Sequence, residues 1–163
     1  MAMDQRFRRW IVCGTLTLAL ACPGALSAQA GADVAVVVHS DVTVDNLSTS
    51  DLRRLVLGDR GFWPGSQRVT LLIRAPVAHE RDIVLKNICE MTEAQFRQHW
   101  IAKVFRADAA VAPKIVYSSE MAVDLVNRIP GAIAFIDAAQ VGRGMHVVRI
   151  DGRLPGEKGY TLR

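Results

Sequence analysis

Three short apolar runs, rich in β-branched residues, recur along the chain. They cover Val34–Val38, Val69–Ile73 and Ala132–Ile136. A continuous apolar run of this length is typical of a strand whose two faces are both buried, as in a sheet covered by helices. The shorter predicted strands are Ile115–Tyr117, Val147–Ile150 and an edge strand at Tyr160–Leu162.

Between these runs, apolar residues recur every three or four positions, which predicts helices. Thr92-Glu93-Ala94-Gln95 is a capping box. It opens a helix whose Phe96, Trp100, Val104 and Phe105 we expect to face inward. The other predicted helices run from a cap at Ser48 or Ser50 to Leu57, from Val77 to Cys89, and, after a cap at Ser118-Ser119, from Glu120 to Arg128.

The alternation of strands and helices with short connections predicts an α/β fold. A mostly parallel or mixed sheet flanked by helices is the expected architecture. Residues 31–163 suffice for one hydrophobic core but not for two sizeable lobes, so a single lobe is predicted.

The first 30 residues are built like a secretory signal peptide. Three arginines lie within residues 6–9, an apolar stretch covers 11–21, and Ala28-Gln29-Ala30 offers cleavage after either alanine. The apolar stretch is short for a membrane span. The sequence therefore predicts a leader, residues 1–30, followed by one periplasmic domain, residues 31–163.

The cysteines bear on this prediction. Cys22 raises the alternative of a lipid anchor, but Ala19-Leu20-Ala21 before it departs from the usual lipoprotein pattern. After cleavage Cys89 is the only cysteine, so no intrachain disulfide is expected. The four histidines show no ligand spacing around it, and neither a metal nor a cofactor is predicted.

The charge is modest. The formal net charge of the whole chain is +4, and part of it belongs to the leader. Because basic and acidic residues are interspersed rather than gathered in one segment, a nucleic-acid partner is not expected.

Two segments carry a resemblance to a known family. They read Leu55-Val56-Leu57-Gly58 followed by Phe62-Trp63-Pro64-Gly65, and Pro130-Gly131-Ala132-Ile133-Ala134-Phe135. They resemble the second lobe of phosphate-type solute-binding proteins of ABC importers, in which a helix ending in "FLG" precedes a tryptophan turn and a late strand reads "PGAIGY". The resemblance covers roughly residues 36–150. It implies a periplasmic-binding-protein-like lobe that binds phosphate or another small anion.

The residues near the predicted strand ends supply the candidate anion site. In an open parallel sheet, ligands bind outside the carboxyl ends of the strands. Arg74 is the sharpest candidate, because its guanidinium suits phosphate or carboxylate. The resemblance implies a Ser-Gly-Thr stretch after this arginine, but the chain has Ala75 to Glu80 instead, and Glu80 would repel an anion. The predicted ligand-binding residues are Arg74, His79, Ser118, Ser119 and Ser40, with Asp137 at the same expected edge.

Structural explanations compete with each of these assignments. Arg74 could instead form an ion pair with Glu80 or Asp82, and the two serines could serve only as helix caps. Tyr117 is expected to pack, and Trp63 to fill the core rather than to hold a ligand.

No catalytic motif is present: the sequence has no nucleophile elbow, Walker loop, dinucleotide fingerprint or zinc-binding His-Glu-x-x-His. An enzyme is not predicted. Two classes remain. The first is an anion-binding module, acting alone or with a second subunit, such as another copy in a homodimer. The second is a non-catalytic interaction protein that has lost ligand binding and contacts an envelope or membrane protein.

Overall fold

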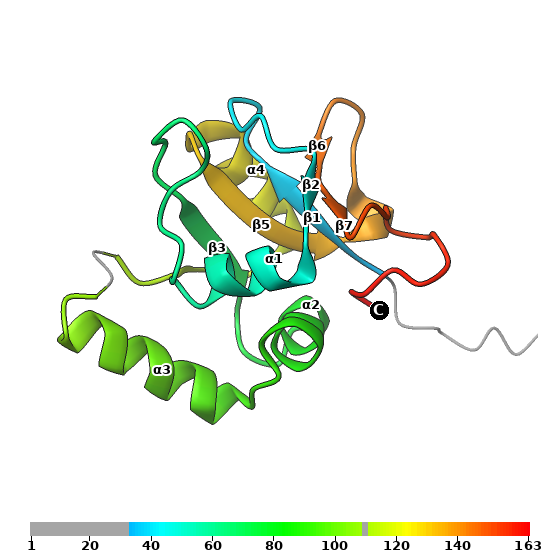
Figure 1. Cartoon of the computed structure of the whole chain (residues 1–163). Helices are drawn as coiled ribbons and strands as arrows, with labels where there is room; N and C mark the ends of the chain where they lie inside the picture. The colour runs from blue at the N-terminus through cyan, green and yellow to red at the C-terminus, as the bar shows by residue number, and fades with distance from the viewer. Residues whose placement is uncertain (1–32, 109–110) are drawn as a thin grey trace, which may run out of the picture.

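The computed structural model describes residues 33–108 and 111–163, and the predicted leader lies outside them. Its main sheet has the strand order β4-β3-β5-β1-β6, and Figure 1 labels all of these strands except β4. A small second sheet pairs β2 with β7. The strands are β1 (Val34–Val38), β2 (Asn46–Leu47), β3 (Thr70–Arg74), β4 (Lys114–Val116), β5 (Ala132–Asp137), β6 (His146–Val147) and β7 (Arg149–Ile150).

The helices surround this sheet. They are α1 (Thr49–Val56), α2 (His79–Ile83) with the π-helical turn η1 (Val84–Cys89), α3 (Glu93–Phe105), α4 (Ser119–Arg128) and the 3-10 turn η2 (Ala138–Gln140). Two apolar clusters lie on opposite faces of the sheet. One joins alternate β1 residues to α1, η1 and α3, and the other joins the remaining β1 residues to α4. A strand buried on both faces explains the unbroken apolar run at 34–38. The predicted α/β lobe is confirmed.

The sheet is mixed rather than fully parallel. β3 runs parallel to β4 and β5, whereas β1 runs antiparallel to β5 and β6. The predicted edge strand at 160–162 does not form. That segment instead contributes Tyr160 and Leu162 to the core, and the Val34 N–H donates to the Leu162 carbonyl at 2.9 Å.

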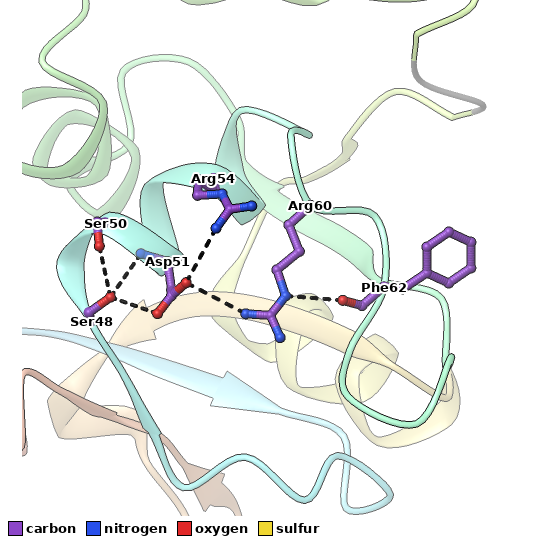
Figure 2. Close-up of polar contacts among 6 residues, drawn as sticks. All are labelled: Ser48, Ser50, Asp51, Arg54, Arg60 and Phe62. Carbon is purple, nitrogen blue, oxygen red and sulfur yellow. Dashed lines mark hydrogen bonds and ion pairs between the residues drawn. The ribbon is translucent and has the colours of Figure 1, made fainter.

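Asp51 makes polar contacts both at the start of α1 and with the loop that follows the helix (Figure 2). The Asp51 backbone N–H donates to the Ser48 hydroxyl at 3.0 Å, which makes Ser48 the N-cap. The Asp51 carboxylate lies 3.7 Å from the Arg60 guanidinium, whose Nε donates to the Phe62 carbonyl at 3.2 Å. One carboxylate thus helps to hold the loop that carries Trp63.

Two predicted helices differ in detail from the structure. The helix predicted from Val77 begins two residues later, because Val77 has a φ of 65° and lies outside it, and its second half is π-helical. α3 has the predicted capping box and buries Phe96 and Trp100. Its end is exposed, however, and the prediction that Val104 and Phe105 face inward is wrong.

Candidate functional site

Arg74 lies at the carboxyl end of β3, beside the start of two helices. The register pairs Arg74 with Val116 of β4, and the Ala75 N–H donates to the Val116 carbonyl at 2.9 Å. α2 follows β3 and α4 follows β4, each after a short connection. This edge of the sheet therefore carries four of the predicted residues: Arg74, His79, Ser118 and Ser119.

Ser40 does not join them. Because β1 runs antiparallel to β5, Ser40 follows β1 at the edge where β5 begins, and the His39 N–H donates to the Ala132 carbonyl at 3.0 Å. Arg74 lies at the opposite edge, since β3 and β5 are parallel. The expectation that Ser40 shares a rim with Arg74 is wrong for this reason. Asp137, at the end of β5, accepts a hydrogen bond from the Ala139 N–H at 2.8 Å and so caps η2.

Three side chains form what we call the Arg74 cluster: Arg74, Glu80 and Ser119. The Arg74 Nε lies 3.3 Å from the Glu80 Oε2, and the Ser119 hydroxyl donates to the Glu80 Oε1 at 3.1 Å. The side chains of Arg74 and Glu80 are only 14% and 9% exposed. Glu80 thus presents its carboxylate to the guanidinium that was predicted to bind an anion, so Arg74 forms the ion pair that was the competing explanation.

The cluster leaves some hydrogen-bonding capacity unused. Among the described residues, the buried Nε and Nη1 of Arg74 have no hydrogen-bond acceptor, because the approach of Glu80 satisfies the distance of an ion pair but not the geometry of a hydrogen bond. These two nitrogens could still donate to a better oriented acceptor.

A second carboxylate, Glu120, lies in the first turn of α4 and is exposed. The pKa of Glu120 is lowered by a hydrogen bond from its own backbone N–H, with smaller contributions from the Ser118 hydroxyl and the charge of Arg74. Glu80 is the carboxylate that contacts Arg74 among the described residues, and a carboxylate already against the guanidinium opposes the entry of a further anion.

The remaining predicted residues cap a helix or lie on the surface. The Ser118 hydroxyl accepts from the Met121 N–H at 3.1 Å and caps α4. His79 is exposed at the first residue of α2. Tyr117 is also exposed, so the prediction that it packs is wrong. In the described part of the chain, no group of three or more His, Cys, Asp or Glu side chains could hold a metal ion.

Sequence reasoning missed Arg81, the arginine that organises this edge. Its side chain is buried and donates to both oxygens of Glu93, at 2.7 and 2.8 Å, and to the Arg74 carbonyl at 2.8 Å. It also lies over the Phe96 ring. Arg81 thereby joins the end of β3 to the start of α3. The spacing of apolar residues in this segment gave no indication that Arg81 would be buried.

Gly58, Trp63 and Gly131, which belong to the segments that carried the family resemblance, serve packing. A Cβ at Gly58, where φ is 72°, would lie 2.5 Å from the Trp100 ring. The indole N–H of Trp63 donates to the Gly131 carbonyl at 2.9 Å, and both tryptophans are buried. The prediction that Trp63 belongs to the core is confirmed.

The structure is thus one α/β lobe in which Arg74, at the end of β3, is paired with Glu80. No protein-family model and no curated protein matches the sequence significantly. Solved structures do match. An ABC-type phosphate transport receptor from Vibrio cholerae has a TM-score of 0.62 at 19% identity, over 76% of this chain and 48% of that one.

Two further structures agree. PstS from Borrelia burgdorferi has a TM-score of 0.64 at 11% identity, over 80% of this chain and 54% of that one. A phosphate binding protein from Stenotrophomonas maltophilia has a TM-score of 0.57 at 11% identity, over 76% of this chain and 40% of that one.

The resemblance seen in the sequence is confirmed at the level of fold. The chain has the fold of part of a phosphate-type substrate-binding protein, and it spans about half the length of the structures that it matches. Sequence identities this low support a shared fold, but they do not establish a shared ligand. No helix in residues 33–108 or 111–163 has the length and apolarity needed to cross a membrane.

Proposed function

We propose that this chain is an exported, non-catalytic lobe of the solute-binding type that acts by contacting a protein of the cell envelope. High-affinity capture of phosphate is not its main role. The proposal makes residues 1–30 a cleaved leader and places the domain in the periplasm. Intact-mass analysis of the exported protein tests this part, since a retained leader or a lipid on Cys22 would contradict it.

One observation carries the proposal: Glu80 already faces Arg74. A bound phosphate would have to displace this carboxylate, which lies 3.3 Å from the guanidinium and also accepts a hydrogen bond from Ser119. The displaced carboxylate would lose its counterion in a site shielded from water, which is costly.

Calorimetric titration with phosphate, sulfate and acetate tests the proposal. We expect the wild-type protein to bind none of them more tightly than about 1 mM, which corresponds to about −4 kcal/mol. A dissociation constant in the micromolar range that Arg74→Ala abolishes would overturn the proposal. Arg53→Ala is the matched control, because Arg53 pairs with Glu90 on the surface and its loss changes the net charge equally.

A second function, binding of a small anion, is favoured by the two buried Arg74 nitrogens that have no acceptor among the described residues. If this function is latent, Glu80→Gln should create it, because the amide removes the competing charge while it still accepts from Ser119. Phosphate binding by Glu80→Gln but not by Glu80→Gln/Arg74→Ala would support a site that Glu80 holds closed. Binding of phosphate by neither variant would remove the second function.

A further inference from the structure

The apolar side chains of α3 become more exposed to solvent toward the carboxyl end of the helix. Along one row of residues four apart, Phe96 is 3%, Trp100 8% and Val104 46% exposed. On the adjacent row, Ile101 is 56% and Phe105 90% exposed. Figure 1 shows α3 extending away from the sheet. An amphipathic stripe of this kind normally faces a packing partner.

A groove lies between this stripe and β4; we call it the α3 groove. Its volume is about 590 Å³, and its lining also includes Pro76, Pro113 and Ile115. Ile115 is partly exposed, and β4 is an edge strand of the sheet. Clustered large apolar side chains that line an open hollow are a common sign of an interaction site.

Trp100 supplies a second observation. Its side chain lines the groove and the residue is buried, yet its indole N–H has no hydrogen-bond partner within the described residues. Buried indole N–H groups normally find an acceptor. This nitrogen is itself enclosed, so an occupant of the groove could reach it only if the Trp100 ring turned.

The charges around the groove favour an acidic occupant. Arg97 lines the groove, and it has no ion-pair partner in the part of the chain that the structure describes. The other basic side chains of the region are already neutralised within the chain: Arg81 by Glu93, Lys103 by Asp59 and Arg106 by Asp108.

We propose that the α3 groove binds an amphipathic helical segment of a partner protein, with aliphatic side chains toward the groove and carboxylates toward Arg97. This rests on the proposed function and names its contact surface. A helix laid in an apolar groove is a common mode of peptide recognition. The hollow favours inserted side chains over a flat membrane surface. In a two-fold dimer built on the groove, the two unpaired copies of Arg97 would lie in the same interface and repel one another.

Anisotropy of a labelled model peptide tests the proposal. The probe is a helix of about 15 residues, or about four turns, with leucine on one face and glutamate flanking it. It is compared with the same peptide carrying lysine for glutamate. The purified protein should bind the glutamate peptide at least about tenfold more tightly, a difference of about 1.4 kcal/mol. Ile101→Asp and Phe105→Asp should each weaken binding by a similar factor, and Arg97→Glu should reduce the preference for glutamate.

Tyr117→Asp is the matched control, because Tyr117 is an exposed aromatic residue that does not line the groove. This variant should bind the glutamate peptide with the wild-type affinity. Unchanged unfolding midpoints would show that the groove variants still fold. Equal affinity for both peptides, no binding of either, or wild-type affinity of Ile101→Asp would overturn the proposal. So would an Ile101-dependent dimer in sedimentation, or Ile101-dependent binding to phosphatidylglycerol vesicles without peptide binding. None of these outcomes depends on the phosphate titration, so a failure here is distinct from a failure of the proposed function.

Discussion

The Arg74–Glu80 pair makes a quantitative prediction about stability. Arg74→Met keeps much of the side-chain volume but leaves the buried Glu80 carboxylate with the Ser119 hydroxyl and no cation. Breaking a buried pair by removing one partner costs about 3 to 5 kcal/mol. Since Arg74 keeps some exposure and Ser119 still donates, we expect the free energy of unfolding to fall by about 2 to 3 kcal/mol.

A double-mutant cycle isolates the interaction itself. Glu80→Gln should also destabilise the domain, and the double variant should lose less than the sum of the two single changes, by about 1 to 3 kcal/mol. Urea unfolding, followed by circular dichroism, measures all four proteins, provided that the slope of the transition stays constant.

Arg53→Met is the control for this cycle. The Arg53–Glu90 pair is similar in distance, at 3.1 Å, but its side chains are 38% and 72% exposed. Exposed pairs contribute at most about 1 kcal/mol, so this change should be nearly neutral. If Arg74→Met costs no more than Arg53→Met, or if the cycle shows no coupling, the Glu80 carboxylate does not hold Arg74 and the main argument against anion binding fails.

Three further predictions concern the rest of the lobe. Gly131→Ala should lower the free energy of unfolding by more than about 2 kcal/mol, because φ is 73° there and the new Cβ would lie 2.2 Å from the Arg68 carbonyl oxygen. Gly144 has a similar φ but open space around it, so Gly144→Ala should lower the free energy of unfolding by less. Burial raises the pKa of Tyr160, so its contribution to stability should be complete below about pH 10, where the unfolded tyrosine keeps its proton, and should be lost above it. An alkaline loss of stability that is unchanged in Tyr160→Phe would contradict this. Burial raises the pKa of Cys89 to about 12, so a disulfide reagent at a pH of about 8 should label it only when the domain unfolds, and rapid native labelling would refute its burial.

The strands and helices were predictable because their signals are local. Val34–Val38 and Ala132–Ile136 are continuous apolar runs, and the box from Thr92 to Gln95 caps α3 as predicted. Strand direction is not a local property. Nothing in the period of β1 tells whether it runs with or against β5, and that choice alone moved Ser40 to the far edge. The same limit applies to Phe105, whose helical spacing fits a buried face although the described chain leaves it exposed.

The location of the candidate site could be predicted from the sequence, but the hydrogen bonds and ion pairs within it could not. The strand-edge rule found Arg74, and the sequence offered Glu80 as a counterion, but only the structure shows that Ser119 also donates to this carboxylate. Arg81 was missed because its role depends on Glu93, twelve residues away, and on the carbonyl at the end of β3. A contact between separate elements leaves no periodic signal in the sequence.

The residues that hold the fold together and those of the candidate anion site are therefore different in this lobe. The positions that carried the resemblance, Gly58 against Trp100 and Trp63 on the Gly131 carbonyl, hold the elements together and lie outside the Arg74 cluster. They would keep the fold whether or not an anion binds. In the second proposed function, anion binding would depend instead on the few side chains around Arg74, where the Glu80 carboxylate pairs with the guanidinium. We therefore expect the architecture to persist whether or not Glu80 opposes a bound anion, and this is why the Glu80→Gln variant separates the two proposed functions.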